Sequence, residues 1–194
     1  MEHDENAIGS LIAAHRDALA EFEKKIPDLI TIRDALLALI SRDGLLMLCG
    51  NGGSAADAIH WAAEWRVRFK KDRRALRAEA LVTDVSTLTA AGNDFGYETV
   101  FSRQVEAVGR KGDALVVFST SGNSENILRA IATAKAQGIL TIGFGGKDGG
   151  KMAPLVDIPF IIPHSETARI QEMHELAMHI LCELVDESLT APQR

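Results

Sequence analysis

The sequence has few cysteines and no long apolar run. Only two cysteines, Cys49 and Cys182, occur in 194 residues, and both fall in apolar or helical segments, which favours buried free thiols over a disulfide. No apolar stretch approaches the roughly 18 residues that a membrane-spanning helix needs. The first ten residues, MEHDENAIGS, lack the basic and apolar regions of a signal peptide. We therefore expect a cytoplasmic protein with reduced thiols.

Basic residues are also in deficit, since 21 Lys and Arg stand against 27 Asp and Glu, a formal net charge of −6. Non-specific binding to nucleic acid requires Lys and Arg that displace counterions, so we expect none; one small phosphorylated ligand stays compatible with this charge. Hydrophobic residues at 46% and charged residues at 25% are an ordinary globular composition. A chain of this length buries about 70% of its unfolded surface. We expect a single domain over residues 1–194.

Hydrophobic periodicity divides this domain into two parts. Residues 1–44 hold two helical patterns, more apolar than an isolated pair can bury, and predict a helical hairpin used in oligomerisation. Residues 45–194 alternate short apolar runs with helical patterns, which predicts an α/β sandwich with a five-stranded parallel sheet flanked by helices. The expected strands cover 45–49, 80–83, 114–118, 139–144 and 158–162, and the helices between and after them cover 55–69, 85–91 with 99–108, 125–137 and 165–189.

Two polar loops follow the first and third expected strands, where parallel sheets bind their ligands. The first is Gly50-Asn51-Gly52-Gly53-Ser54, and the second, Ser119 to Ser124, carries four hydroxyls, a glycine and an amide. Glycines, hydroxyls and helix N-termini can surround a phosphate without a lysine. A tight turn and a serine-rich cap remain the structural alternatives. Together the loops favour one phosphorylated small molecule that spans both.

Two nucleotide-binding motifs are matched only in part. Gly50, Gly52 and Ala55 fit the dinucleotide fingerprint, but the second expected strand offers no well-placed acid for a ribose: Glu79 precedes its apolar run, and Asp84 comes about 30 residues after the loop instead of about 20. Gly145-x-x-x-x-Gly150-Lys151 begins a P-loop, but Met152 replaces the hydroxyl that would bind Mg²⁺. We reject the P-loop and regard a dinucleotide enzyme as the weaker alternative.

Imidazole and carboxylate groups recur at helical spacing beyond the loops. His60 and Glu64 lie four residues apart on the helix after the first loop, and Gln171 and His179 lie on the last helix. Such groups suit a divalent metal such as zinc, acid–base chemistry, or a solvated surface pair. His174, in the apolar stripe of the last helix, is expected to be a hydrogen-bonded core residue.

These residues lie in segments that resemble the phosphoheptose isomerases, enzymes of the sugar isomerase (SIS) family. The similarity runs from Gly50 to Leu189 and includes GNGGSAADAIHWAAEW, DVSTLTAAGNDFGYE, VFSRQVEAVGRKGD, FSTSGNSENI, GKDGGKMA and ARIQEMHELAMHIL. The resemblance implies a flavodoxin-like SIS fold and a homotetramer with active sites between subunits. It also implies conversion of sedoheptulose 7-phosphate to D-glycero-D-manno-heptose 7-phosphate, for the heptose of bacterial surface polysaccharides.

The resemblance also assigns roles to particular residues. It implies one zinc ion per subunit on His60, Glu64, Gln171 and His179, and an acid–base pair of Glu64 and His179. Substrate-binding positions are Asn51, Gly52, Gly53, Glu64, Asn93, Asp94, Ser119, Thr120, Ser121, Ser124 and Gln171, of which Ser119, Thr120, Ser121 and Ser124 hold the phosphate. Non-catalytic relatives that bind the DnaA replication initiator are the competing reading, and the presence of Glu64 and His179 favours the enzyme. The chain departs from the isomerase pattern mainly at Ile59, Trp61 and Trp65.

Overall fold

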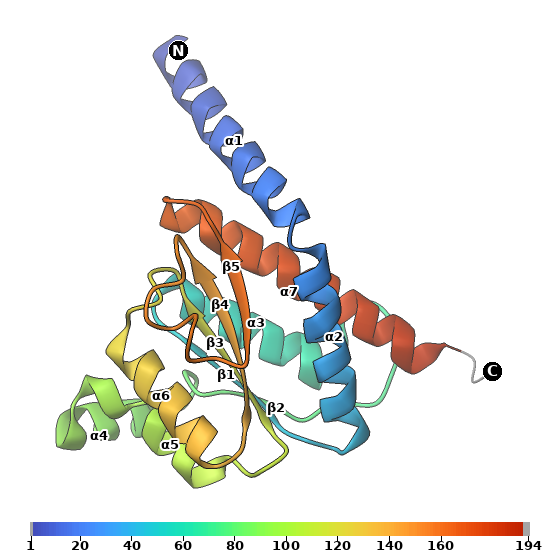
Figure 1. Cartoon of the computed structure of the whole chain (residues 1–194), viewed down its shortest axis with the longest axis vertical. Coiled ribbons are helices and arrows are strands. Elements are labelled where there is room, and N and C mark those ends of the chain that lie inside the picture. The colour runs from blue at the N-terminus through green and yellow to red at the C-terminus, as the bar shows by residue number, and fades with distance from the viewer. Residues whose placement is uncertain (1, 192–194) are drawn as a thin grey trace.

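Five parallel strands form one sheet at the centre of the molecule (Figure 1). The computed structural model describes residues 2–191. The strands are β1 (Leu46–Gly50), β2 (Ala78–Ala80), β3 (Ala114–Ser119), β4 (Leu140–Gly146) and β5 (Ile158–Ile162). Their order in the sheet is β2-β1-β3-β4-β5, and this flavodoxin-like arrangement confirms the predicted fold class.

The strands are buried because their side chains are apolar on both faces of the sheet, as parallel strands require. Every residue of β1 and β3 is buried. The second strand begins and ends earlier than the expected 80–83, since the amide of Thr83 donates to the carbonyl of Ala80 at 3.2 Å and turns the chain out of the sheet. The other four strands match their predicted positions to within two residues.

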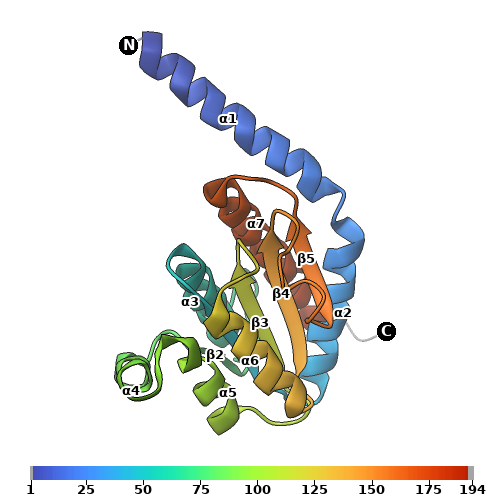
Figure 2. The same cartoon turned by 60° about the vertical axis from the view of Figure 1, so that its left-hand side comes forward.

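Helices cover both faces of the sheet (Figure 2). On one face lie α2 (Ile26–Ser41), α3 (Gly53–Arg66) and α7 (Thr167–Thr190), whose apolar side chains pack with Leu46 and Leu48. On the other lie α4 (Val85–Phe95), α5 (Ser102–Val108) and α6 (Glu125–Ala136), packed with Met47 and Cys49, and a short 3-10 helix, η1 (Tyr97–Thr99), joins α4 to α5. No helix within residues 2–191 is long and apolar enough to cross a membrane.

The N-terminal helices both form, but they follow one another end to end instead of folding back side by side. α1 (Glu2–Glu23) leads away from the body of the molecule, whereas α2 packs beside α7 (Figures 1 and 2). Two contacts tie α1 to the start of α7: His15 Nδ1 lies 2.7 Å from Glu172 Oε2, and Arg169 donates to the carbonyl of Leu11 at 3.0 Å. The outer part of α1 leaves Ile8, Leu11 and Ile12 about half exposed, at 56%, 55% and 49%.

The topology brings the two polar loops together. β1 pairs directly with β3, with Gly50 opposite Phe118, so the loops that follow these strands emerge side by side at one edge of the sheet. α3 and α6 each begin immediately after one of these loops, at Gly53 and Glu125. The positive ends of two helices therefore start at the same place.

Candidate active site

A cavity of about 260 Å³ lies between the two loops and the start of α7. It is lined by Asn51, Gly53, Ser54, Phe118, Ser119, Thr120, Ser121, Ser124, Thr167 and Gln171. We call it the serine pocket. The hydroxyl-bearing residues predicted from the second loop all line it, with Asn51 and Gly53 from the first. Among these lining residues there is no Lys or Arg, so an anion here would be held by hydroxyls, amides and helix N-termini.

Glycines allow the close approaches that shape this pocket. Gly52 has a φ of +57°, a left-handed conformation that favours glycine, and caps the start of α3. A Cβ on Gly53 would lie 2.6 Å from the amide nitrogen of Gln171, so its absence lets α7 come close to the loop. Gly122, with a φ of +64°, lies directly against the backbone of Gly149.

The glycine-rich segment 145–152, which resembles part of a P-loop, contacts the second loop of the serine pocket. The amide of Met152 donates to the carbonyl of Gly122 at 2.9 Å, and the amide of Lys151 donates to Asn123 Oδ1 at 3.2 Å. These bonds hold the second loop in place. The segment therefore has a structural role, which agrees with the rejection of a P-loop.

The side chain of Asn51 is fixed at the mouth of the pocket by three hydrogen bonds. Its Oδ1 accepts from Asn126 Nδ2 at 2.8 Å and from the Tyr97 hydroxyl at 3.0 Å, while its Nδ2 donates to Asn126 Oδ1 at 3.0 Å. Such a network holds an amide in one orientation. It also attaches η1, which carries Tyr97, to the first loop.

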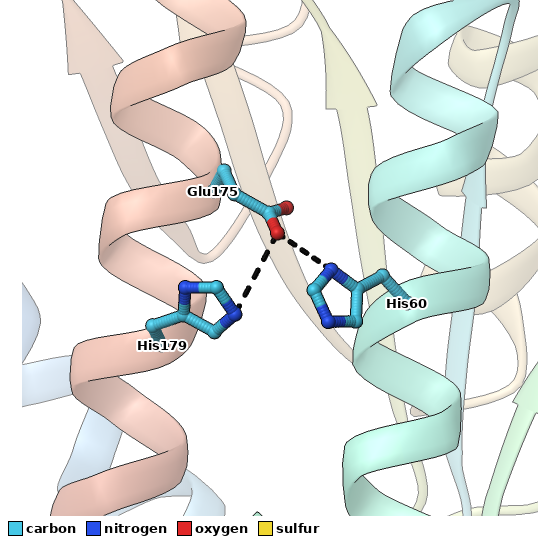
Figure 3. A group of neighbouring side chains, drawn as sticks. All are labelled: His60, Glu175 and His179. Atoms are coloured by element: carbon cyan, nitrogen blue, oxygen red, sulfur yellow. Dashed lines mark ion pairs between the residues drawn. The ribbon is translucent and has the colours of Figure 1, made fainter.

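A second group of functional side chains lies between α3 and α7 (Figure 3). His60 Nδ1 is 2.5 Å from Glu175 Oε1, and His179 Nε2 is 3.6 Å from the same oxygen. The two imidazole rings meet edge to face with centroids 5.1 Å apart, and Phe69 stacks on His179 at 5.2 Å. One ligand atom from each of these three residues lies within 4.8 Å of the others. Two imidazoles and a carboxylate fit the donor preferences of zinc and similar divalent cations.

The remaining predicted metal ligands lie on either side of this group. Glu64 is one turn along α3, with Oε1 3.2 Å from His60 Nε2, the nitrogen that does not face Glu175. Gln171 lies at the serine pocket, where its Nε2 donates to Ser54 Oγ at 3.5 Å. Of the four predicted ligands, the structure brings His60 and His179 together, places Glu64 beside His60, and places Gln171 nearer the loops.

Glu175 belongs to this group, and the sequence analysis did not single it out. Gln171, Glu175 and His179 stand four residues apart, so they share one face of α7. Gln171 and His179 were selected as possible metal ligands, and Glu175, midway between them, was not considered. The four-residue spacing was the signal that would have found it.

Asp57, one turn before His60 on α3, is another acidic residue near this group. Burial raises the pKa of its carboxyl to about 7; the negative charge of Glu175 raises the pKa further, and His60 lowers it. Its Oδ2 is buried and has no hydrogen-bond partner among the described residues. This carboxyl therefore takes up a proton far more readily than an exposed aspartate does.

Asn93 and Asp94 do not line the serine pocket in this single chain. Both are exposed on α4, where Asn93 Nδ2 donates to Asp94 Oδ1 at 2.7 Å. Asp94 lines a different cavity, of about 360 Å³, together with Arg103 and Gln104. A role for these two residues in the serine pocket of the same chain finds no geometric support.

His174, Trp61 and Trp65 lie in the core. His174 is fully buried and donates from Nε2 to the carbonyl of Gly145 at 3.0 Å, as expected of a core histidine, and burial lowers its pKa to about 4. Trp61 and Trp65 are 0% and 1% exposed and pack on the sheet side of α3. The tryptophans next to His60 and Glu64 in sequence thus support the helix from the side facing the core.

Comparisons with known proteins agree with this arrangement of a doubly wound sheet and polar loops. Residues 12–146 match the SIS domain family. A phosphoheptose isomerase from Nitratiruptor is 60% identical over 143 residues, 74% of this chain and 76% of that protein. One from Helicobacter pylori is 48% identical over 174 residues, 89% of this chain and 91% of that protein.

Solved structures give the same result. A phosphoheptose isomerase from Neisseria gonorrhoeae is 41% identical, with a TM-score of 0.89 over 94% of this chain and 98% of that one. One from Francisella tularensis is 34% identical, with a TM-score of 0.92 over 95% of this chain and 98% of that one. The fold and the polar loops define a SIS-domain protein. Within that class, the chain belongs to the phosphoheptose isomerase family. These relatives give no support to the alternative of a DnaA-binding protein.

Proposed function

We propose that the protein is an aldose–ketose isomerase that converts sedoheptulose 7-phosphate to D-glycero-D-manno-heptose 7-phosphate, for the heptose of bacterial surface polysaccharides. The single observation that carries this proposal is the position of the serine pocket at the end of one row of side chains. Gln171 lines the pocket, and Glu175 and His179 continue along the same face of α7 toward His60. A phosphate in the pocket would therefore place an extended sugar along the imidazole and carboxylate groups.

The phosphate would be bound by Ser119, Thr120, Ser121 and Ser124, with Asn51 and Gly53 on the opposite wall and Gly52 capping α3 beside them. Contacts with the phosphate lie far from the carbons that react, so they supply binding energy that orients the open-chain sugar. Hydroxyl and backbone donors suit a dianion because they need no compensating basic residue. This arrangement also agrees with the net charge of −6.

The reaction moves one proton between C1 and C2 through an enediol. Glu64 is the proposed base: its carboxylate removes a proton from C1 of the ketose and returns it to C2. His179 is the proposed partner that transfers the second proton between the oxygens of C1 and C2. Both side chains are half-buried, which lets solvent reach them before the sugar binds.

A zinc ion is part of this proposal, one per subunit, with His60, Glu64, Gln171 and His179 as the ligands implied by the family resemblance. The fit of the site rests on the imidazoles of His60 and His179, which lie near one another, and on Glu64, whose Oε1 lies 3.2 Å from His60 Nε2. When bound, the ion would polarise the sugar's open-chain oxygens and stabilise negative charge on them. His60 and His179 would keep their ring orientations with and without the ion, because each imidazole already contacts the carboxylate of Glu175.

We further propose a cytoplasmic homotetramer with active sites between subunits. The exposed apolar residues of α1 give the chain a surface suited to another copy. Asn93 and Asp94 would then contribute to a site in a neighbouring subunit, which accounts for their distance from the serine pocket of their own chain.

The test is turnover of sedoheptulose 7-phosphate by the purified protein, with and without a strong chelator. We expect product with the wild-type protein, and none with Glu64→Gln or His179→Gln while the oligomer and its melting temperature persist. Full activity in both variants would disprove the assigned roles. Absence of product in every condition would disprove the proposed reaction.

A further inference from the structure

Another polar cavity lies at the opposite edge of the sheet from the serine pocket. Its volume is about 360 Å³, and we call it the arginine pocket. It is lined by Arg42, Asp43, Gly44, Arg77, Arg110, Lys111, Gly112 and Asp113. These residues precede β1, β2 and β3, whereas the serine pocket follows the carboxyl ends of β1 and β3. β1 alone spans five residues, or about 16 Å, so a ligand in one cavity does not touch the other.

The lining of the arginine pocket carries an excess of positive charge. It holds four basic side chains but only two carboxylates, those of Asp43 and Asp113. Asp113 is buried, and its two oxygens accept from the backbone amides of Leu45 and Arg110, each at 2.8 Å. The carboxylate of Asp43 lies 3.5 Å from Arg74, which is not part of the lining. Among residues 2–191, none of the four basic side chains forms an ion pair with a carboxylate, so the pocket is positive in a chain of net charge −6.

Each arginine donates to backbone carbonyls, which is the structural alternative to a ligand site. Arg42 donates from Nε to the carbonyl of Gly112 at 2.6 Å, and Arg77 donates from Nη1 to the carbonyl of Asp43 at 2.6 Å. Arg110 donates from Nη1 to carbonyls at the end of α5. A guanidinium has five N–H groups, and these bonds use one nitrogen of each arginine; the other nitrogens have no partner among the described residues. Backbone capping therefore accounts for only part of each guanidinium.

The remaining guanidinium nitrogens suit the oxygens of phosphate groups. A guanidinium fork binds two oxygens of a phosphate at once, and a lysine adds a compact point charge. The donors come from three segments that are far apart in sequence, at residues 42, 77 and 110–111. The first and third segments approach closely, since a Cβ on Gly44 would lie 2.9 Å from the carbonyl oxygen of Gly112. An anion in this pocket would therefore meet donors from more than one side.

Size and charge favour two phosphate groups over one. The serine pocket is smaller, at about 260 Å³, has no Lys or Arg in its lining, and suits a single phosphate. The arginine pocket has about 360 Å³ and four basic side chains. A larger volume and a greater positive charge match a multivalent anion, of which a pyrophosphate group is the smallest phosphate form.

We propose that the arginine pocket binds a pyrophosphate group, presented by inorganic pyrophosphate or by a nucleoside diphosphate. The three arginines contact the phosphate oxygens, and the lysine contributes charge. This site goes beyond the proposed function: it lies at the other edge of the sheet and does not depend on the heptose phosphate reaction.

Isothermal titration calorimetry of the full-length protein with sodium pyrophosphate tests the proposal, in buffer without added divalent cations, which would bind the ligand. We compare the wild-type protein with Arg77→Gln, Arg110→Gln and the double variant. Loss of one charged fork should weaken binding at least about fivefold, and loss of both about twentyfold or more. Arg77→Lys keeps the charge without the fork, so its affinity should lie between those of wild type and Arg77→Gln.

Lys111→Gln separates a ligand site from backbone capping. Lys111 forms no hydrogen bond to a carbonyl among the described residues, so its replacement removes a charge from the pocket and leaves every cap in place. We expect a loss of about threefold in pyrophosphate affinity. Circular dichroism confirms that each variant is folded, and this variant keeps the test valid if the double variant is not.

Two controls locate the binding. Arg33→Gln makes the same charge change on α2, at an arginine that pairs with Asp34, and should leave the affinity within about twofold of wild type. The double variant Ser121→Ala with Ser124→Ala alters the serine pocket, the other candidate for a phosphate. It should leave the binding that depends on Arg77 and Arg110 unchanged.

Titrations with inorganic phosphate and ADP identify the source of the anion. Tighter binding of ADP than of pyrophosphate would support a nucleoside diphosphate, and equal binding would support recognition of the pyrophosphate group alone. The inference would be overturned by absence of pyrophosphate binding in wild type, by equal affinity for inorganic phosphate, by unchanged affinity in the folded arginine variants and Lys111→Gln, or by a loss in Arg33→Gln as large as that in Arg77→Gln. None of these measurements uses turnover, so the result is independent of the proposed reaction.

Discussion

Gly53 lines the serine pocket, and its missing side chain makes room for the amide of Gln171. The nearest neighbour of a Cβ at this position would be the far end of a flexible side chain, the Gln171 amide, at 2.6 Å. A glutamine can move its amide at little cost to the fold. Substitution of Gly53 should therefore change substrate binding more than it changes the free energy of unfolding.

Gly53→Ala should displace the Gln171 amide from the serine pocket. We expect the KM for the sugar phosphate to rise by about tenfold, the loss of roughly 1.4 kcal/mol in binding, while the free energy of unfolding changes by less than about 1 kcal/mol. Steady-state kinetics and urea denaturation measure the two effects. Gly9→Ala is the matched control: a Cβ there meets nothing within 4 Å in the middle of α1, so it should stabilise the helix slightly and leave the KM unchanged.

His174 gives the fold a defined dependence on pH. Burial lowers the pKa of its imidazole to about 4 from the ordinary 6.5. The unfolded chain therefore binds a proton between pH 6.5 and 4 that the folded chain does not. The contribution of His174 to the free energy of unfolding is complete above pH 6.5. It is lost as the pH falls toward 4, by about 3 kcal/mol in all.

Urea denaturation of the metal-free protein at pH 7.5 and pH 5 measures this loss. His174→Phe removes the titrating group and keeps an aromatic ring beside Phe118 and Phe144, which the imidazole contacts at 5.9 and 5.7 Å between centroids. We expect a smaller fall in stability between the two pH values in this variant. An equal fall in both proteins would show that other groups cause the acid sensitivity.

The elements that carry the site are held in register by a buried ion pair. Arg73, in the segment after α3, lies 2.7 Å from Asp186 on α7, and the two side chains are 3% and 2% exposed. Arg73 also donates to the carbonyls of Glu64 and Trp65, while Asp186 accepts from the amides of Lys70 and Lys71. These hydrogen bonds lower the pKa of Asp186, against the effect of burial. The pair thus fixes the end of α3 against α7.

Removal of either partner leaves a buried charge without its counterpart. We expect Arg73→Met or Asp186→Asn to lower the free energy of unfolding by about 3–5 kcal/mol. The double variant should lose less than the sum of the two. A double-mutant cycle by urea denaturation measures this coupling, and additive losses would show that the pair does not act as a unit.

For helices and strands, the sequence predicts whether an element exists and of which type it is. It predicts less well where that element lies in space. The apolar runs predict the existence of all five strands because parallel strands buried on both faces are mostly apolar, and they miss the bounds of β2, which contains Glu79. The end-to-end arrangement of α1 and α2 was not predictable, since it depends on contacts such as His15 with Glu172, 157 residues apart. For the same reason the sequence does not show that Asn93 and Asp94 stand apart from the serine pocket.

Within the site, the sequence predicts residues on a common loop more readily than residues that meet across helices. The hydroxyls of Ser119 to Ser124 are neighbours in sequence, and the cavity gathers them. Glu175 escaped prediction because a glutamate on an amphipathic helix is normally a solvated residue. The 2.5 Å contact with His60 depends on the position of another helix, which the sequence of α7 does not show.

For the molecule as a whole, the surface of α1 carries three exposed apolar side chains close together. Ile8, Leu11 and Ile12 together border a groove with His15, Arg169 and Glu172. If copies of the chain assemble through this surface, a charge there must be buried without a partner. Assembly should therefore be sensitive to single substitutions on α1.

Leu11→Glu should shift the protein from tetramer to smaller species, by about tenfold or more in dissociation constant, without unfolding the sheet domain. Light scattering after size-exclusion chromatography measures the mass, and circular dichroism the fold. The control is Leu155→Glu, which changes the same kind of side chain, 44% exposed, in the segment between β4 and β5. It should leave the mass unchanged. A tetramer in Leu11→Glu at all concentrations would contradict a role for this part of α1.

The burial of Trp61 and Trp65 has an optical consequence. The chain has two tryptophans, and both belong to α3, so all tryptophan emission originates from a single helix. That helix also carries His60 and Glu64, on its other side. Intrinsic fluorescence is thus a reporter that needs no label. Its wavelength records whether this one helix is seated against the sheet, and its changes on adding metal or sugar report events at the helix that carries His60 and Glu64.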